Sequence, residues 1–550
     1  MSAVVPPTAQ GQHLTGATDW EAFRPPARPP SHPWRLFLHP LTAICAVQAG
    51  LSLALVWSNT AFGDEAEYLW LGHLEWAHWQ HGATWPSAYA DRVLSGSPVI
   101  YPPLGALADG VGGLAAARVL SLFFVLGATV LLYFTARPLI GRSGAVAATA
   151  LWALSEPALR LAFATFDPLS LFLTALSAWL IVLGYRRGGM FVVAAAAALA
   201  LADATAYSGI VIAPVVIAFA FLVWVHRMRA RRAILRAACL AGCSAAFFVL
   251  LIITSRSWAG LRFTVLYRSI ADHQSSLLVL KDIWIYSGLI ISLAIIGLFI
   301  AVGTERRQRA ALLVLLSCAA FVVPAAQLHD QTGWSLDKHL AYGIWFATIA
   351  AGYAYSRLIR WLPTVSRRLI VICSILALAY PAVSGFGAAW QVYHSWANAG
   401  SFIKEFRPMA AQSRGSIYVA GQERIAQYYT VQGRDWTRWT TLELDPPVLR
   451  DQQEAYYTSQ LNSGKYDVIA LFYPTTFSSG QQMTGPDLLS PPSIHINQDL
   501  LRLVGGTREP GLLSLTLALE KDREYRLVHV GSYSSAHEHN IYAIWEKVPS

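Results

Sequence analysis

Charged residues are scarce in this sequence of 550 residues, because only 13% are Asp, Glu, Lys or Arg while 55% are hydrophobic. Soluble globular chains carry about 25% charged residues. The shortage excludes an ordinary water-soluble domain as the main body of the protein. It indicates a chain that exposes much of its surface to lipid.

Cysteine is rare as well. The five cysteines all fall in or beside apolar runs, and none lies after residue 390: Cys45, Cys239, Cys243, Cys318 and Cys373. This placement excludes a disulfide framework, and the sequence also lacks a CxxC pair that would suggest a structural zinc site.

Long apolar runs are abundant. About eleven of them have roughly the 20 residues that a helix needs to cross the hydrocarbon core of a bilayer. They lie near residues 41–57, 115–136, 144–163, 168–184, 190–206, 209–225, 237–254, 283–302, 310–326, 339–355 and 369–388. The pattern predicts an α-helical polytopic membrane protein with about eleven transmembrane helices.

The basic residues of the membrane region gather in alternate short loops. These loops contain Arg137 and Arg142, Arg186 and Arg187, Arg227 to Arg236, Arg306 to Arg309, and Arg357 to Arg368. The positive-inside rule therefore predicts a cytoplasmic N-terminus and an extracytoplasmic C-terminal region in the plasma membrane. The net charge of +9 is explained by these loops and by anionic lipid, so we expect no nucleic-acid partner.

Composition divides the chain into three parts. Residues 1–37 are rich in Pro and lack the pattern of a cleaved signal peptide, so we expect a disordered cytoplasmic tail. Residues 38–390 form the membrane domain. Residues 391–550 are more polar and contain strand-like runs such as "GSIYVAG" and "KYDVIALFYP", which predict a small extracytoplasmic α/β domain.

The first outer loop, residues 58–113, is long and rich in aromatic side chains. It opens with "GDEAEYLW", which places Asp64, Glu65 and Glu67 within five residues of one another. We expect the stretch to lie along the membrane interface as amphipathic helices. Two interpretations of the acids remain open: Asp64 caps the first of these helices, or the acids do chemistry.

A second acid lies on the same predicted side of the membrane. "TFDPLSLF" places Asp167 in a short outer turn, where an N-cap followed by Pro168 would explain it locally. Upstream, Glu156 and Arg160 stand four apart in an apolar run, in the order that favours an ion pair. Ionisable side chains at membrane depth usually mark a functional site.

These residues resemble the GT-C glycosyltransferases, in the branch of bacterial protein-mannosyltransferase-like and aminoarabinose-transferase-like enzymes. The resemblance rests on acids that open the first outer loop, on "YPPLG" (Tyr101 to Gly105) that closes it, and on Asp-Pro-Leu at a later helix start. It implies a polyprenyl-phosphate-linked sugar as donor and an extracytoplasmic glycan, lipid or protein as acceptor.

The resemblance also implies roles for individual residues. Asp64 would act as the general base, Glu65 would hold the acceptor, water or a divalent metal ion, and Asp167 would be the second acid of the site. Tyr68, Tyr101, Pro102 and Pro103 would form a pocket of the first loop. If a metal ion is present, Asp64 and Glu65 would bind it.

One departure from the family pattern concerns the cation for the donor phosphate. Relatives often have Lys in a "TKYSG"-like turn, whereas "DATAYSG" has Ala206 at that position. Lys338 and His339 at a later helix start, with Arg160, are the candidate donor-phosphate ligands. A Lys338 side chain that extends to the lipid interface is the alternative interpretation.

Two other classes of function remain open from the sequence. A polytopic transporter would also have apolar helices, although its ionisable residues would cluster near the middle of the membrane. A non-catalytic protein of envelope assembly would explain the outer domain but leaves the paired acids without a role.

Overall fold

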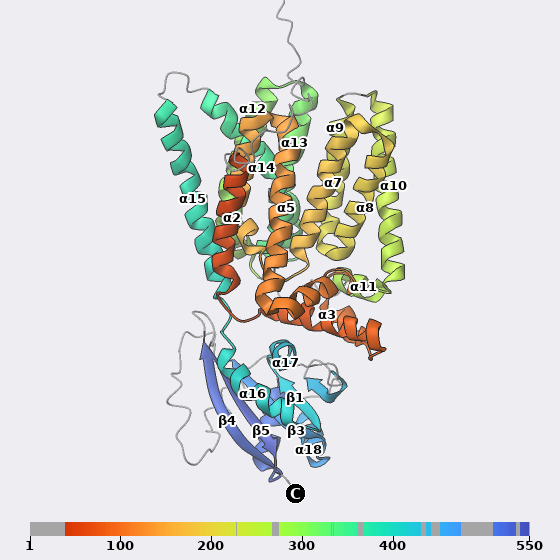
Figure 1. The fold of residues 1–550 in the computed structure, drawn as a ribbon, viewed down its shortest axis with the longest axis vertical. Coiled ribbons are helices and arrows are strands. Elements are labelled where there is room, and N and C mark those ends of the chain that lie inside the picture. Colours follow the sequence, from red (N-terminus) through yellow and green to blue (C-terminus); the bar gives the residue numbers. More distant parts are fainter. Residues whose placement is uncertain are drawn as a thin grey trace, which may run out of the picture.

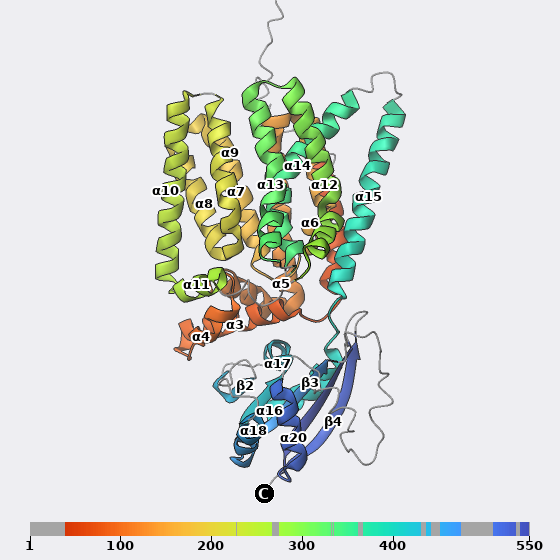
Figure 2. The same cartoon turned by 180° about the vertical axis from the view of Figure 1, so that it is seen from behind.

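The computed structural model describes residues 39–548, apart from 227, 267–273, 332, 334, 361–366, 431–435, 442–451, 475–509 and 535–538. The predicted tail, residues 1–37, lies outside the described residues. A bundle of long helices forms one end of the molecule and a small α/β domain forms the other, with α3 lying across the helix ends between them (Figures 1 and 2).

The predicted apolar runs all fall on helices. The bundle consists of α2 (Pro40–Val56), α5 (Tyr101–Ala153), α7 (Asp167–Arg187), α8 (Gly189–Thr205), α9 (Ala213–Val225), α10 (Ala230–Thr254), α12 (Ser276–Thr304), α13 (Arg307–His329), α14 (Leu336–Arg360) and α15 (Arg367–Tyr393). Among the described residues, seven helices are long and apolar enough to cross a membrane. The chain is a multi-pass membrane protein.

Helix α5 carries two of the predicted runs. It is interrupted at Gly112 and Gly113 and again at Gly141, where the backbone leaves helical values. Both Gly113 and Gly141 have positive φ, which L-residues with a side chain rarely adopt. The interruptions divide the long helix into segments, which contain the predicted run 115–136 and the first part of the run 144–163.

The predicted run 144–163 is shorter in the structure. Helix α5 ends at Ala153, and the short helix α6 (Glu156–Arg160) begins afterwards with Pro157 in its first turn. In a continuous helix, Pro157 could not donate to the carbonyl group of Ala153 and its ring would clash with that group, so the chain breaks before α6. The expectation that Arg160 lies within a continuous membrane helix was therefore wrong.

Helix α14 forms the centre of the bundle. Its side chains are buried along most of its length, and it packs against α5, α12 and α13. A Cβ on Gly352 would lie 2.4 Å from the carbonyl oxygen of Gly144 on α5. Small residues of this kind let membrane helices approach closely, and this contact holds α14 against α5.

The predicted first outer loop, residues 58–113, is helical, as expected. It contains α3 (Gly63–His81) and α4 (Ser87–Val93) and continues directly into α5 at Tyr101. Its last turn is attached to the bundle by backbone pairing, because Ser97 N donates to Ala204 O and Tyr207 N donates to Ser95 O, both at 2.8 Å. The short helix η2 (Tyr207–Ile212) follows this contact and leads into α9.

The C-terminal domain contains a five-stranded sheet of order β2-β1-β3-β5-β4. Its strands are β1 (Ser416–Ala420), β2 (Trp439–Thr441), β3 (Tyr466–Pro474), β4 (Tyr525–Ser534) and β5 (His539–Lys547). Strands β2, β1 and β3 are parallel, while β5 is antiparallel to both β3 and β4. The α/β domain predicted from the sequence is confirmed.

Helices cover both faces of this sheet. Helix α16 (Gly400–Gln412) packs Phe402 and Phe406 on one face, and α18 (Gln453–Asn462) with α20 (Pro510–Lys521) covers the other. Helix α17 (Glu423–Thr430) lies at the end of the sheet that faces the bundle, beside α3 (Figures 1 and 2). The remaining helical segments are α11 (Trp258–Leu266) and η4 (Trp436–Arg438).

Candidate active site

Asp64 lies in the first turn of α3, where the positive end of the helix dipole favours a carboxylate. Its Oδ2 lies 3.1 Å from Nζ of Lys338, which comes from the first turn of α14. The side chain of Asp64 is 19% exposed, whereas that of Lys338 is only 9% exposed. Asp64 is therefore the member of this pair that a molecule outside the bundle can reach.

Asp167 approaches the same ammonium group from α7. Its Oδ2 lies 3.3 Å from Lys338 Nζ and accepts a hydrogen bond of 3.2 Å from the Thr165 hydroxyl. The carboxylate is fully buried, and Oδ1 has no hydrogen-bond partner among the described residues. Lys338 thus lies between two acids that belong to different helices.

Aromatic rings line one side of this cluster. The Lys338 ammonium lies 5.8 Å from the ring centre of Phe166, and the ring of Tyr68 stacks on Phe166 at 4.6 Å. Because Lys338 is buried between acids and an aromatic ring, it does not extend to the lipid interface.

Arg160 and His339, the other two predicted phosphate ligands, have partners of their own. Arg160 forms an ion pair with Asp337, the neighbour of Lys338, so the expected pair with Glu156 is replaced by one between α6 and α14. The ring nitrogen Nδ1 of His339 lies 3.0 Å from the side-chain nitrogen of Gln327 on α13. The structure brings Arg160 beside the Lys338 cluster through Asp337.

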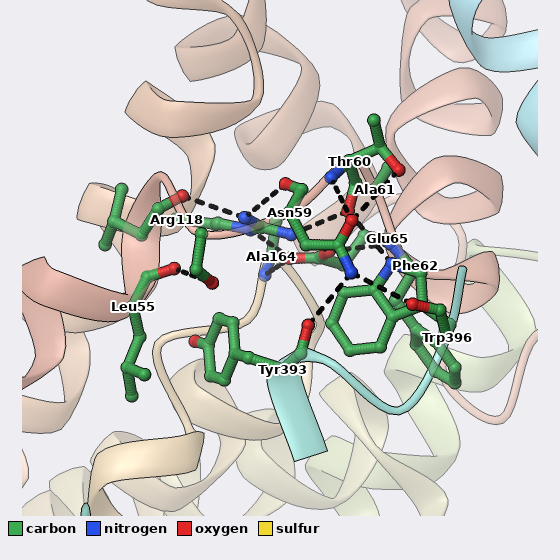
Figure 3. Close-up of polar contacts among 12 residues, drawn as sticks. Leu55, Asn59, Thr60, Ala61, Phe62, Glu65, Arg118, Ala164, Tyr393 and Trp396 are labelled. Atoms are coloured by element: carbon green, nitrogen blue, oxygen red, sulfur yellow. Dashed lines mark hydrogen bonds and ion pairs between the residues drawn. The ribbon is translucent and has the colours of Figure 1, made fainter. Parts of the chain in front are cut away.

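Glu65 occupies a different environment from Asp64. Both of its oxygens accept from Arg118, with Nε–Oε1 2.8 Å and Nη2–Oε2 2.7 Å, and both partners are completely buried (Figure 3). The amides of Ala164 and Phe62 donate to the same carboxylate at 2.8 and 2.9 Å. Four donors use the acceptor sites of one carboxylate, so no oxygen of Glu65 is left for an acceptor substrate or a metal ion.

Arg118 also binds the segment that joins α2 to α3. Its remaining donors reach the carbonyl groups of Val56, Asn59 and Thr60, at 2.8, 3.1 and 3.2 Å. Asn59 in turn donates to the carbonyl groups of Tyr393 and Trp396, both at 3.0 Å, in the segment that leads to the C-terminal domain (Figure 3). The pair therefore fixes the end of α2, the start of α3 and the end of α15.

The residues of "YPPLG" are buried and hold α3 against α5. The hydroxyl groups of Tyr101 and Ser121 lie 3.0 Å apart, and Trp76 donates to the carbonyl oxygen of Pro103 at 2.8 Å. A Cβ on Gly72 would meet the carbonyl oxygen of Pro102 at 2.0 Å. Tyr68, Tyr101, Pro102 and Pro103 thus pack in the interior between α3 and α5, and the pocket expected of the loop stays a prediction.

Sequence reasoning missed three charged residues of this region. Arg118 carried a usable signal, because it is an ionisable residue within an apolar run. Asp337 and Arg424 carried none, since each acquires its partner only when distant helices meet. The guanidinium of Arg424 lies 3.8 Å from Asp64 Oδ1 and 3.3 Å from Glu67 Oε2.

A metal ion does not fit the pair predicted to hold it. Glu65 is fully occupied by Arg118 and two amides, and Asp64 faces the ammonium of Lys338. Across the described part of the chain, no three His, Cys, Asp or Glu side chains gather in a way that could hold a metal ion. We derive no step of the chemistry through a metal.

No protein-family model and no curated protein matches the sequence. Solved structures do resemble the fold. The oligosaccharyltransferase of Archaeoglobus fulgidus, tethered to an acceptor peptide, aligns with a TM-score of 0.55 at 11% identity, over 92% of this chain and 74% of its own. ArnT from Cupriavidus metallidurans, bound to undecaprenyl phosphate, aligns with a TM-score of 0.53 at 12% identity, over 92% of this chain and 97% of its own.

A third similar structure is the arabinofuranosyltransferase AftD from Mycobacteria, with a TM-score of 0.52 at 13% identity. The alignment covers 92% of this chain but only 40% of AftD. All three similar proteins are GT-C glycosyltransferases. The chain has the GT-C fold. Within this fold, the acids of α3 and α7 and the lysine of α14 meet at the end of the bundle that faces the α/β domain.

Proposed function

We propose that this chain is a membrane glycosyltransferase that moves a sugar from a polyprenyl-phosphate donor to an extracytoplasmic acceptor, which is a cell-envelope glycan, lipid or protein. The observation that carries the proposal is the position of Lys338 between Asp64 and Asp167 at the end of a GT-C bundle. The ligand of the similar ArnT structure, undecaprenyl phosphate, supports the choice of donor.

The chemistry requires a base and a stabilised leaving group. An oxygen or nitrogen of the acceptor attacks the anomeric carbon, the bond between that carbon and the phosphate oxygen breaks, and the phosphate leaves with the electron pair. Asp64 takes the acceptor's proton, because it is the more accessible of the two acids. Asp167, fully buried, holds Lys338 in place.

The departing polyprenyl phosphate gains negative charge, which a cation in a water-poor site stabilises strongly. With Ala206 at the position where relatives often have Lys, the charge comes from elsewhere. Lys338 stands at the start of α14, where the helix dipole adds a positive end. Arg160, which pairs with Asp337 beside Lys338, adds a second positive charge for the phosphate. His339, the residue after Lys338 in α14, is the third proposed phosphate ligand.

Glu65 has a supporting role in this proposal. Its four hydrogen bonds fix the start of α3 and thereby the direction of Asp64, the residue immediately before it. Glu65, which the family resemblance placed beside the acceptor, water or a metal ion, is therefore a positioning residue in this proposal.

The test uses the purified full-length protein in lipid nanodiscs with a panel of polyprenyl-phosphate sugars, and measures release of polyprenyl phosphate and labelling of envelope acceptors. We expect transfer with at least one donor, and Asp64→Asn to lower kcat by about a hundredfold or more while the protein stays folded. Asp330→Asn, at the end of α13, serves as the matched control and should transfer normally.

Two outcomes would contradict the proposal. Absence of transfer and of donor binding across the panel, in protein that melts cooperatively, would favour the non-catalytic assembly protein. Normal transfer by Asp64→Asn would remove the base and leave Asp64 as a helix-terminal acid.

A further inference from the structure

Helix α17 is the part of the C-terminal domain that lies nearest α3 (Figures 1 and 2). Two of its tyrosines form hydrogen bonds with the membrane domain. The Tyr428 hydroxyl donates to Asp109 Oδ1 at 2.6 Å, and the Tyr429 oxygen accepts from the amide of Ala61 at 2.7 Å. Burial raises the pKa of Tyr429 to about 12, so this hydroxyl is neutral under physiological conditions. These contacts hold α17 at a defined place on the first outer loop.

Arg424 projects from the same helix toward two acids of α3. Its Nη1 lies 3.3 Å from Glu67 Oε2 and 3.8 Å from Asp64 Oδ1. Asp64 and Glu67 are three residues apart, so they share one face of the helix. A single guanidinium from the C-terminal domain therefore serves both the proposed base and the acid one turn later.

Glu67 is built to keep Arg424 there. Its side chain is only 1% exposed, and its second oxygen accepts a hydrogen bond of 2.7 Å from the hydroxyl of Tyr89 on α4. A buried carboxylate needs a cation, and Arg424 supplies one. Glu67 thereby fixes the guanidinium beside Asp64, whose own contact with Arg424 is longer.

Asp64 consequently receives cations from two parts of the molecule. Lys338 approaches Oδ2 from the membrane domain and Arg424 approaches Oδ1 from the C-terminal domain. Other charged groups near it are Glu67 and the Glu65–Arg118 pair on α3 and α5, Asp167 on α7 beyond Lys338, and the Arg160–Asp337 pair of α6 and α14 beside Lys338. A second cation keeps the carboxylate ionised and fixes the direction of the oxygen that faces the acceptor.

We propose that Arg424 is a positioning residue for Asp64, so that the C-terminal domain completes the active site and transfer requires α17 to be docked on α3. This inference rests on the proposed glycosyltransferase function. It assigns the C-terminal domain a part in the reaction through one side chain.

The experiment compares Arg424→Met, Arg424→Lys and the matched control Arg407→Met, which removes an exposed arginine of α16 in the same domain. All are measured in the full-length protein in nanodiscs, as kcat and KM across a range of pH. We expect Arg424→Met to lower kcat at least about tenfold, because the base is misdirected. Arg424→Lys should recover part of this loss, and Arg407→Met should match the parent protein.

The pH profile separates a role at the base from a merely structural role. Removing a cation from beside a carboxylate favours its protonated form, so the acidic limb of kcat in Arg424→Met should move to higher pH. Glu67→Gln removes the carboxylate that holds Arg424 and should also lower kcat, and the double variant Arg424→Met/Glu67→Gln should lose less than the two single losses combined.

Docking is measured independently by hydrogen exchange of the amides of α3 and α17. Tyr428→Phe removes the bond to Asp109 and keeps Arg424, so it should loosen docking and lower kcat, with a smaller shift of the acidic limb than Arg424→Met causes. Arg424→Met with unchanged kcat and pH profile would overturn the proposal, and so would a gain in activity, which would make Arg424 an inhibitory contact. If the parent protein transfers no sugar, the glycosyltransferase proposal itself fails. If the parent is active and Arg424→Met has the same kcat and pH profile as the control Arg407→Met, only this inference is refuted.

Discussion

At the scale of the residue, the site contains two carboxylates and one ammonium group, all of them largely buried. Lys338 is shared between Asp64 and Asp167, while Arg160 is held by Asp337 beside it. Buried charges persist only when paired, so each of these side chains constrains the others. A donor phosphate would compete with the two carboxylates for the same ammonium group.

Substitution of Lys338 tests that competition directly. We expect Lys338→Met to weaken binding of undecaprenyl phosphate by about ten- to a hundredfold, because a charge-assisted hydrogen bond to the phosphate is lost. Lys338→Arg should retain much of the affinity. Lys281→Met, which removes an exposed cation at the start of α12, provides the control.

Binding is measured by native mass spectrometry of the detergent-solubilised protein, with the melting temperature recorded for each variant, since the two acids lose their partner in Lys338→Met. Unchanged affinity in folded Lys338→Met protein would transfer the phosphate role to Arg160 or to a bound metal.

The pair of Glu65 and Arg118 should behave as a structural unit. Either Glu65→Gln or Arg118→Met leaves a buried charge without its partner, which costs about 3–5 kcal/mol of unfolding free energy. The double variant should lose less than the sum of the two single variants. Glu405→Gln on α16, a partly exposed carboxylate, is the control.

Denaturant titration of each variant in detergent checks this expectation. If the Glu65→Gln protein keeps its full stability and loses only sugar transfer, Glu65 takes a direct part in the reaction and the structural role is refuted.

At the scale of the element, α3 is the part whose position decides the geometry of the site. It carries Asp64, Glu65 and Glu67, and it is fixed by Arg118 at its start and by the backbone of Pro102 beside Gly72. The close approach at Gly72 leaves no space for a side chain, so α3 can lie at this distance from α5 only with glycine there.

Gly72→Ala should therefore displace α3. The new Cβ would lie 2.0 Å from a carbonyl oxygen and 2.4 Å from its carbon, and backbone atoms cannot turn aside as a flexible side chain does. A displacement of about 1 Å can cost roughly a hundredfold in rate, so we expect a large fall in kcat together with a lower melting temperature.

Gly50→Ala on α2 is the matched control, because nothing lies within 4 Å of the Cβ it would add. Sugar transfer and thermal melting measured side by side decide the matter. Equal behaviour of the two alanine variants would mean that α3 and α5 tolerate a wider separation.

At the scale of the whole molecule, the arrangement has a clear polarity. Helix α3 and the C-terminal domain lie at one end of the bundle, and the arginine-bearing starts of α10 and α13 and end of α14 lie at the other end (Figure 1). A site at this end meets donors that arrive through the membrane and acceptors that arrive from the aqueous side. The direction of the polarity in the cell follows from the positive-inside rule and remains a prediction.

Cysteine labelling tests the orientation. The natural cysteines all lie at or before residue 373, so a cysteine placed at Arg407 reports on the C-terminal domain. We expect Arg407→Cys to react with a membrane-impermeant maleimide in intact cells, and Arg231→Cys at the opposite end to react only after permeabilisation. The reverse pattern would overturn the topology and the proposed extracytoplasmic reaction together.

Much of the architecture was predictable from the sequence because helix formation in lipid depends on local composition. Ten of the eleven apolar runs, the helical first loop and the strands "GSIYVAG" and "KYDVIALFYP" appear where the sequence places them, and the run 144–163 is broken. The break at Pro157 and the short strand β2 were missed, since one depends on a single proline within an apolar run and the other on pairing with β1.

By itself, the sequence determined that the chain is a polytopic membrane protein with an α/β domain, and that acids stand at the starts of two of its helices. Only the tertiary structure decided which charges meet. Lys338 lies 274 residues after Asp64, and Glu65, next to Asp64 in the chain, points instead to Arg118. Ion pairs between helices depend on how those helices pack, and packing is set by contacts distant in sequence, such as Gly352 against Gly144 and Gly72 against Pro102.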